Sequence, residues 1–411
     1  MKQHLKDNLL VPYIALLFIV LSFFLQPIGE LFVGLHNIQK SESILLTDYV
    51  AVGGIGPALL NSGLLMGLSY LLIRKLGLRV TGSIFAGILT IGGFAFFGKN
   101  IFNVAIIYLG VYLYSRYKRI NIRSVIVVFL FSTGLSPLSS VVMFGLGIDL
   151  IYSIPLGIFV GVTAGFLLVE LASRAISFHQ GYDLYNVGFA SGILSFSIFS
   201  IFKLLNLDYK TNLIYTNDSH LLLFYLFIII CLVYIVLGLY LSDFKIQGYK
   251  NILKLSGRAA TDFTRRDNQA MTMFNIGITG LAALLVLVML DVHMNGPVFG
   301  GLFTIIGFAA FGKHVRNILP PMIGVFIVSI LFNIDLSVPV ILAILFSTGL
   351  APVAGEHGII VGILTGMLHL PINFSLGQLH GGVLLYSNGF AAAFTAIIVT
   401  SIVATFKRSD L

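Results

Sequence analysis

Two copies of the sequence Ser-Thr-Gly-Leu-x-Pro lie inside long apolar stretches, at residues 132–137 and 347–352. Glycine relaxes a helix, and proline removes a backbone donor and frees a carbonyl group. Freed backbone groups are tolerated inside a bilayer only beside protein or water, and paired interruptions of this kind form the solute sites of transporters. Their oxygen atoms suit a small cation or a neutral hydrogen-bonding solute, whereas packing kinks between close helices are the alternative interpretation. The candidate binding residues are Ser132, Thr133, Gly134, Ser347, Thr348 and Gly349.

A second motif also occurs twice: His-x-Gly, then Tyr, then Gly-Phe-Ala, at residues 179–190 and 380–391. Neutral histidine can both donate and accept a hydrogen bond, and it titrates near neutral pH. We therefore expect a solute or ion site here, or else a hydrogen-bonded helix interface. Asp183 occurs in the first copy only and is a candidate for ion coupling. The candidate binding residues of this motif are His179, Tyr185, His380 and Tyr386.

The third repeated motif is Gly-Lys, at Gly98-Lys99 and Gly312-Lys313, each followed four residues later by an asparagine. Each lysine lies at the end of an apolar segment, from which its side chain can extend to the membrane interface. A lysine at each mouth of a pathway would attract an anionic solute. Lys99 and Lys313 are therefore candidates for the mouths of a pore.

Four further polar residues lie in apolar surroundings. Glu356 and His357 follow the second Ser-Thr-Gly motif, whereas residues 141–142 in the first copy are valines. An ionisable group at membrane depth is costly and indicates function, so this pair is a candidate for proton or sodium coupling. At the membrane interface the pair would simply be solvated. Asn61 and Asn275 are also binding candidates, although capping or cross-linking of helices is their default interpretation.

The composition shows in which solvent these residues must lie. The chain has 411 residues and a mean hydropathy of +1.01, with 58% hydrophobic and 10% charged residues. Soluble domains carry about 25% charged residues, so a bilayer must surround most of this chain. The net charge of +8 does not indicate nucleic-acid binding, because the basic residues cluster in short loops between apolar runs. We expect the lipid bilayer and a small molecule or ion as partners, no nucleic acid, and leave homo-oligomerisation open.

Apolar stretches long enough to cross a bilayer, which takes about 20 residues, recur along the chain. The clear candidates are residues 9–27, 55–74, 80–98, 100–116, 150–173, 185–204, 220–242, 270–291, 295–312, 316–333 and 384–406. Two further regions, 123–147 and 337–370, are apolar but interrupted by Gly, Ser, Thr and Pro, and each fits one span plus a re-entrant turn or two short spans. The expected fold is therefore all-α, a polytopic membrane protein of about 12–14 transmembrane helices.

The motifs recur in the same order at nearly constant spacing. Residues 82–99 match residues 296–313 at a shift of 214 residues, and the Ser-Thr-Gly and His-x-Gly motifs match at shifts of 215 and 201. Three matches in one order indicate duplication. With the basic clusters in the cytoplasm, the helices containing Asn61 and Asn275 run in opposite directions. We therefore predict two inverted repeats with broken or re-entrant helices.

The predicted organisation has four parts with different roles. These are residues 1–50, an N-terminal transmembrane helix and external loop; 51–206, membrane repeat 1; 207–268, a linker helix and basic cytoplasmic loop; and 269–411, membrane repeat 2. The basic clusters, which include Lys407 and Arg408, predict cytoplasmic N- and C-termini and a multi-pass protein of the cell membrane.

No catalytic motif is recognisable in the sequence. It lacks a glycine-rich phosphate loop, a His-Glu-x-x-His sequence and a Gly-x-Ser-x-Gly sequence. The single cysteine, Cys231, cannot form an internal disulfide, and no Cys/His cluster has zinc spacing. We expect no cofactor, no metal and no enzymatic activity. A membrane-embedded enzyme acting on a lipid-like substrate is the alternative of another class, and it would need clustered acids or histidines.

The repeated blocks Gly-Phe-Ala-x-Phe-Gly-Lys and Leu-Phe-Ser-Thr-Gly-Leu-x-Pro resemble one family of prokaryotic multi-spanning proteins defined only as a domain of unknown function. This resemblance implies a membrane protein over nearly the whole chain. The plan is also distantly similar to the urea-transporter architecture of two inverted halves with short pore helices. Residues 294–302 are similar to that family's Asn-Pro-x-x-Gly-Leu segment, but a glycine separates Asn from Pro and the first copy has neither.

Together these patterns predict a secondary transporter with its solute site between two inverted repeats. Glu356, His357 and Asp183 occur in one copy each, and this asymmetry favours an ion-coupled carrier. A passive channel for a small polar solute is the alternative. A channel would have a continuous narrow pore and no charged residue at mid-depth.

Overall fold

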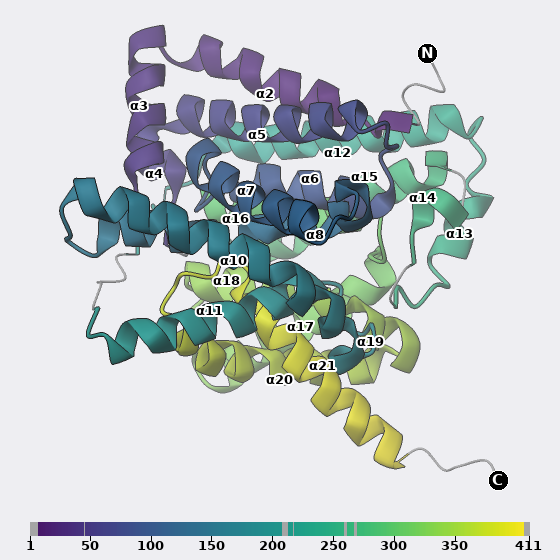
Figure 1. The fold of residues 1–411 in the computed structure, drawn as a ribbon. Coiled ribbons are helices and arrows are strands. Elements are labelled where there is room, and N and C mark those ends of the chain that lie inside the picture. The colour runs from purple at the N-terminus through teal and green to yellow at the C-terminus, as the bar shows by residue number, and fades with distance from the viewer. Residues whose placement is uncertain are drawn as a thin grey trace.

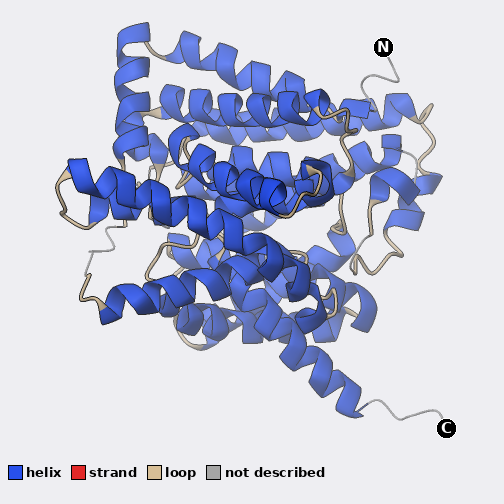
Figure 2. Cartoon of the chain, viewed as in Figure 1, coloured by secondary structure: helices blue, strands red, loops and turns tan. Residues whose placement is uncertain are grey.

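The computed structural model describes almost the whole chain as helix (Figure 2). The described residues are 7–44, 46–207, 213–216, 218–258, 261–266 and 269–406. Within them the only β-structure is three isolated bridges. Lys407 and Arg408, which entered the prediction of cytoplasmic termini, lie outside the described residues.

The first half of the chain runs from purple to teal in Figure 1. Its α-helices are α2 (Val11–Leu25), α3 (Ile28–Lys40), α4 (Tyr49–Gly53), α5 (Ile55–Lys75), α6 (Gly82–Phe94), α7 (Ile101–Tyr117), α8 (Ile126–Phe131), α9 (Ser136–Ser140), α10 (Leu150–His179) and α11 (Asn186–Leu204). Short 3-10 segments η1 (Ile122–Val125) and η2 (Ser132–Leu135) and a π-helical segment η3 (Val141–Gly145) join α8 and α9 into one helical run.

The second half runs from teal through green to yellow. Its α-helices are α12 (Leu221–Leu241), α13 (Gln247–Ile252), α14 (Phe263–Arg266), α15 (Gln269–Met289), α16 (Gly296–Phe308), α17 (Val315–Leu331), α18 (Val338–Phe346), α19 (Ala351–His357), α20 (Ile359–Gly377) and α21 (Ser387–Phe406). The 3-10 segment η4 (Ser347–Leu350) joins α18 to α19, and η5 (Gln378–His380) extends α20.

The lengths and apolar composition of these helices make the chain a multi-pass membrane protein. Nine described helical segments are long and apolar enough to cross a bilayer, or ten if α2 and α3, which are bent by 119°, form one span. Three shorter apolar helices are α6, α16 and α17. The predicted all-helical membrane fold is confirmed. The predicted count of 12–14 exceeds the nine or ten long spans because it included these short helices.

Helices α6 and α16 form the centre of the molecule and are buried along their whole length. They run antiparallel, because Gly93 near the end of α6 meets Gly300 near the start of α16, while Gly307 meets Ala86. A Cβ atom added at Gly93 would lie 2.5 Å from the carbonyl oxygen of Gly300, so only glycine permits this approach of the two backbones. In Figure 1 the two central helices lie between α2, α5 and α12 on one side and α11, α20 and α21 on the other.

Side-chain caps begin the central helices and the helices that follow them. The Thr81 side chain accepts from the Ile84 backbone N–H, and the Asn295 side chain accepts from Val298, which starts α6 and α16 respectively. A reciprocal capping box formed by Asn100 with Asn103 begins α7, and at the start of α17 the Asn317 side chain accepts from the His314 backbone N–H. These caps fix both ends of the turns that connect α6 to α7 and α16 to α17.

The two Ser-Thr-Gly motifs tighten a helix without breaking it. Residues 122–145 and 338–357 are each a single helical span, and the motifs form the 3-10 turns η2 and η4 within them. Pro137 and Pro352 lie in the first turns of α9 and α19, where a backbone N–H has no partner within the helix and its loss costs little. The predicted broken or re-entrant helices at these motifs are therefore continuous spans with one tightened turn.

Two further segments differ from the sequence-based expectation. Residues 28–40, predicted to belong to an external loop, form helix α3 and pack beside α4 and α5. Residues 337–370 contain one whole span and the start of another, since α20 begins at Ile359 directly after Gly358. Gly358 has a φ of +91°, which lets the chain turn sharply between α19 and α20.

Candidate functional site

Asn61 and Asn275 hold the turns that carry the lysines of the two Gly-Lys motifs. The Asn61 side-chain N–H group donates to the carbonyl oxygens of Ala95 and Lys99, both at 2.8 Å. Asn275 makes the same two bonds, at the same distances, to Ala309 and Lys313. Both asparagines are fully buried, so they cross-link helices, which was the default interpretation from the sequence.

Lys99 is fully buried and faces the second half of the chain. Its Nζ donates to the hydroxyl oxygen of Tyr386 at 2.5 Å. The ammonium also lies 4.6 Å from the centroid of the Tyr386 ring and 4.8 Å from that of Phe94, within cation–π distance. Tyr386 belongs to the second His-x-Gly motif, so this contact joins the two halves of the chain.

Lys313, in the second half of the chain, makes the corresponding contact with a tyrosine of the first half. Its Nζ donates to the hydroxyl oxygen of Tyr185 at 2.5 Å and to Thr348 Oγ1 at 2.8 Å. It lies 4.6 Å from the ring centroid of Tyr185 and 5.0 Å from that of Phe308. The sequence placed Lys99 and Lys313 at the mouths of a pore. The structure instead buries both at 0% exposure, because the capped turns direct them into the core.

The Ser-Thr-Gly motifs form the seats of these two tyrosines. A Cβ atom added at Gly134 would overlap the ring of Tyr386, and one at Gly349 would overlap the ring of Tyr185. The carbonyl oxygen of each glycine also accepts a backbone N–H from the residue before the tyrosine, at 3.1 Å and 3.0 Å respectively. Each glycine therefore keeps the tyrosine of the other half against the helix.

The hydroxyl groups of these motifs bond within their own helices. Each donates to the carbonyl three residues earlier: Ser132 to Phe129, Thr133 to Leu130, Ser347 to Ile344 and Thr348 to Leu345. Such back-bonding satisfies a hydroxyl inside an apolar helix. Of these four described residues, Thr348 alone also accepts a hydrogen bond from a lysine, Lys313. The glycines of the Ser-Thr-Gly motifs thus contact the tyrosine rings, and the hydroxyl groups of these motifs lie beside the site.

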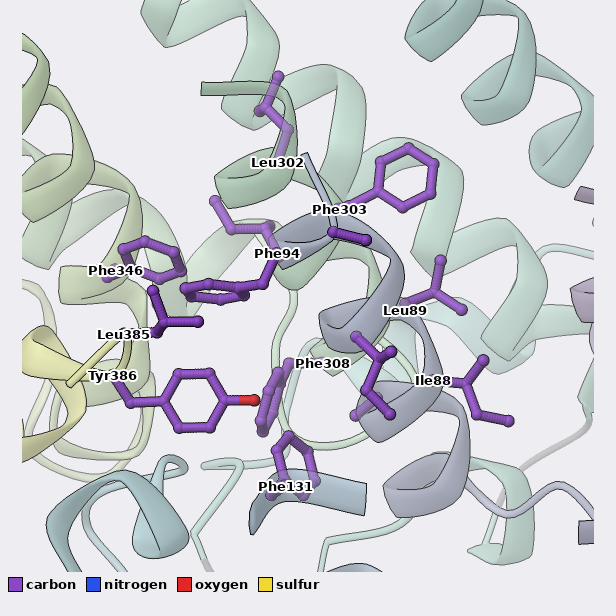
Figure 3. Packing of buried hydrophobic residues seen from close by; sticks show 14 of the residues in the cluster. Ile88, Leu89, Phe94, Phe131, Leu302, Phe303, Phe308, Phe346, Leu385 and Tyr386 are labelled. Carbon is purple, nitrogen blue, oxygen red and sulfur yellow. The ribbon is translucent and has the colours of Figure 1, made fainter. Parts of the chain in front are cut away.

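A cavity of about 400 Å³ lies where the two halves meet. Six aromatic side chains line its centre: Phe94, Phe131, Tyr185, Phe308, Phe346 and Tyr386. Figure 3 shows Tyr386 with its hydroxyl pointing toward Phe308, with Phe94 and Phe131 on either side. The cavity reaches the surface at Ile176 and Arg265, whose side chains are exposed. An apolar chamber with a few polar groups is the usual form of a small-molecule site.

Comparison with known families gives one match. The chain matches the family described as Protein of unknown function (DUF1576) over residues 28–204 and 241–405. It belongs to the DUF1576 family. No curated protein matches the chain, and no solved structure matches it. DUF1576 membership confirms the resemblance to a family of unknown function, while the distant resemblance to urea transporters stays a prediction.

The first His-x-Gly motif of this DUF1576 protein lines the cavity through His179 and Asp183. His179 Nε2 lies 2.9 Å from Asn186 Oδ1, and its Nδ1 accepts the Asp183 backbone N–H at 3.3 Å. One carboxylate oxygen of Asp183 accepts the Tyr185 N–H at 2.8 Å, and its Oδ2 is buried without a hydrogen-bond partner. An unpartnered buried oxygen costs free energy: burial raises the pKa of Asp183 to about 8, while the Tyr185 N–H and Lys313 act to lower it.

The second His-x-Gly motif lies on another cavity. His380 Nε2 is 3.0 Å from Ser387 Oγ, and Ser387 lines a cavity of about 610 Å³ together with Lys203 and Gly377. Tyr386, one residue earlier, lines the first cavity. The chain segment that begins α21 therefore separates the two cavities.

Glu356 and His357 lie at the edge of the molecule. Glu356 Oε1 accepts from the Tyr182 hydroxyl at 2.6 Å and from Arg258 Nη1 at 3.1 Å, and its side chain is 33% exposed. The His357 ring stacks on Tyr182. Partial burial and the Glu356 carboxylate raise the pKa of Tyr182 to about 12, so this phenol keeps its proton and donates to Glu356. Glu356 thus forms a partly exposed ion pair away from the central cavity, and His357 packs beside it on Tyr182.

Two aspartates that the sequence analysis did not single out connect the halves. The carboxylate of Asp262 accepts the backbone N–H of Gly82 at 3.2 Å, and that of Asp48 accepts the N–H of Gly296 at 3.4 Å. Each aspartate thereby caps the central helix of the other half. The signal was present in the sequence, since Thr-Asp followed by an aromatic residue occurs at residues 47–49 and 261–263, again 214 residues apart.

The described residues contain no group of three or more His, Cys, Asp or Glu side chains placed to hold a metal ion. The polar side chains that line the first cavity are those of Ser83, Thr90, His179, Asp183, Tyr185, Asn186, Asp262, Arg265, Thr304, Tyr386 and Asn388. This arrangement can hold a small molecule by its apolar body and a few hydrogen bonds.

Proposed function

We propose that the protein is a secondary transporter that moves a small solute across the cell membrane through the central cavity. One observation carries this proposal: the cavity is lined by matching residues from both halves, at the shifts found in the sequence. These pairs are Thr90 with Thr304, Phe94 with Phe308, Phe131 with Phe346, and Tyr185 with Tyr386. A solute site between two related halves is the common plan of secondary transporters.

The exposed lining residue Arg265 indicates an opening of the cavity beside the basic connector, and a single opening would favour a carrier over a channel. Beyond its centre it is lined by Ser83, Val127 and Asp262. The matching residues Pro297 and Leu342 are buried and do not line it. A carrier alternates between two such states, with the matching residues opening in the second state. The 610 Å³ cavity beyond Tyr386 would then be the vestibule of the opposite side.

The orientation in the membrane follows from the basic connector between the halves. Residues 242–268 carry the lysines and arginines that the positive-inside rule places in the cytoplasm. The cavity opens beside Asp262 and Arg265 of this connector, so we propose that the state described is open to the cytoplasm. The antiparallel central helices α6 and α16 support two inverted halves with cytoplasmic termini. We propose transport without chemical conversion of the solute.

Cysteine labelling tests the alternation. In a Cys231→Ser background, Ser83→Cys should react with a membrane-impermeant maleimide from the cytoplasmic side, and Pro297→Cys only from the opposite side. Purified protein in liposomes should also move a small solute, and saturating solute should change the two labelling rates in opposite directions. Simultaneous labelling of both positions from one side, or a solute flux with Pro297→Cys never labelled, would contradict alternating access.

A further inference from the structure

The groups around the central cavity indicate the class of molecule that it holds. We propose that the cavity binds a small organic anion with an aromatic body, such as an aryl carboxylate, and that the hydroxyl groups of Tyr185 and Tyr386 hold its negative group. The physiological role of this binding rests on the proposed transport function. The binding itself can be measured separately.

The balance of charge around the cavity calls for an anion. Lys99 and Lys313 are both fully buried, and among the described residues neither forms an ion pair within 4.0 Å. Burial disfavours the charged form of Lys313, and Asp183 is the carboxylate that offsets part of this effect. The other lining carboxylate, Asp262, is already bonded to Gly82. Burial disfavours the charged form of Lys99, which has no carboxylate partner among the described residues, so a bound anion would supply the counter-charge that stabilises its ammonium form.

The hydrogen-bond pattern leaves the hydroxyl hydrogen of each of the two tyrosines available for donation to a ligand. A lysine ammonium only donates, so each phenol oxygen must accept, and its own hydrogen is left for another acceptor. Each phenol also has a threonine hydroxyl of a Ser-Thr-Gly motif beside it: Thr348 Oγ1 lies 3.5 Å from the Tyr185 hydroxyl, a weak contact, and Thr133 lies beside that of Tyr386. Both phenols line the cavity, and Figure 3 shows that of Tyr386 pointing among the phenylalanine rings. A phenol polarised by an ammonium donates strongly to an anionic oxygen.

Aromatic rings ordinarily favour a cation, but two of the rings in this cavity already contact the ammonium groups of the two lysines. Lys99 Nζ lies over Phe94 at 4.8 Å, and Lys313 Nζ lies over Phe308 at 5.0 Å. A cationic ligand would meet two buried ammonium groups nearby, and like charges repel strongly in a low dielectric. The remaining ring surfaces provide apolar contact for the body of the ligand, and about 400 Å³ accommodates a one-ring acid.

Calorimetric titration of the purified full-length protein in detergent tests the proposal. The probes are benzoate, phenylacetate and 3-phenylpropanoate, with phenylacetamide and phenethylammonium as the neutral and cationic counterparts. We expect at least one acid to bind at a single site, the amide to bind about tenfold more weakly or worse, and the ammonium not to bind. Tyr386→Phe and Tyr185→Phe should each weaken the acid about tenfold while changing amide binding less than about twofold.

Tyr182→Phe is the matched control, because this tyrosine donates to Glu356 at the surface and not to the cavity ligand. It should leave acid binding unchanged. The proposal is overturned if none of the acids binds, or if the amide or the ammonium binds as tightly as the best acid. It is also overturned if Tyr185→Phe and Tyr386→Phe both bind the acid as tightly as the parent protein. Acid binding without flux of any acid in liposomes would refute the transport proposal alone. Flux of another solute without acid binding would refute this inference alone.

Discussion

Lys99 and Lys313 occupy matching places in the chain, yet their surroundings differ. Lys99 bonds to Tyr386 and has no carboxylate beside it, whereas Lys313 bonds to Tyr185 and Thr348 and is influenced by Asp183. The position that matches Asp183 in the second half is a leucine. The same lysine–tyrosine geometry is therefore partly neutralised in one place and not in the other. The negative group of an anion should lie nearer the Lys99–Tyr386 pair.

Replacing each lysine by the similarly long, uncharged methionine should have the largest effect and should separate the two sites. Lys99→Met should reduce aryl-acid binding and flux about 100-fold, because it removes the uncompensated charge, and Lys313→Met only about tenfold, because Asp183 already offsets it. Titration calorimetry and liposome flux measure both. Lys118→Met, at an exposed ion pair, should change neither.

Asp183→Asn should erase this difference. In that background Lys313 is as uncompensated as Lys99, so the two methionine variants should lose binding to the same extent. Equal losses already in the parent protein, or a larger loss for Lys313→Met, would show that Asp183 does not set the asymmetry.

Substitution of the two glycines that contact the tyrosine rings should cause similar losses of stability, whereas substitution of the two lysines should have unequal effects on binding. Gly134→Ala and Gly349→Ala would each place a Cβ atom in a tyrosine ring, and overpacking of this kind costs about 2 kcal/mol of unfolding free energy. Thermal unfolding of purified protein should show two similar decreases. Gly145→Ala is the control, because its nearest neighbour atom would lie at 3.5 Å, an ordinary contact. A silent Gly349→Ala would mean that the seat of Tyr185 is looser than that of Tyr386.

The two threonines should differ by a smaller amount. Thr348→Val removes a hydrogen bond to the Lys313 ammonium and should cost about 1.5 kcal/mol of stability. Thr133→Val loses its bond to the Leu130 carbonyl within the helix and should cost about 0.5 kcal/mol. Chemical denaturation of both variants makes the comparison. Equal costs would mean that the contact of Thr133 with the Tyr386 hydroxyl stabilises the protein as much as the bond between Thr348 and Lys313.

The smallest effect is expected at Glu356. Glu356→Gln weakens a partly exposed ion pair with Arg258 and should change stability by about 0.5 kcal/mol or less, with flux unchanged. Flux in liposomes under a proton or sodium gradient provides the measurement. A loss of gradient-driven flux in this variant would return Glu356 to the role of a coupling group, and Asp183 would no longer be the residue that distinguishes the halves.

Long-range composition and periodic motifs made most of the fold predictable. The apolar runs located the spans to within a few residues because a bilayer imposes a minimum helix length. Helix α3 was missed because Glu30, His36 and Lys40 interrupt its apolar run. The Ser-Thr-Gly turns were expected to break their helices. They remain continuous because each hydroxyl bonds back to its own helix and each proline stands in a first turn.

The candidate site was less accessible to sequence reasoning. The motifs identified both tyrosines, His179 and Asp183, all of which line the cavity. They could not show that each lysine meets the tyrosine of the other half, because that contact depends on how the halves pack. The lining phenylalanines have no distinguishing mark in a chain with 35 of them. Whether an apolar side chain faces a cavity or a neighbour is decided by packing alone.

The exchange of caps between the halves has a consequence for biosynthesis. Gly82 and the aspartate that caps it, Asp262, are 180 residues apart. On the ribosome, α6 must therefore enter the membrane long before its cap is translated. Its first turn has to wait, hydrated or held by the insertion machinery, until the connector emerges. A ribosomal pause or a truncation before Asp262 would leave this helix without its cap, and the nascent first half should be a preferred target of membrane proteases.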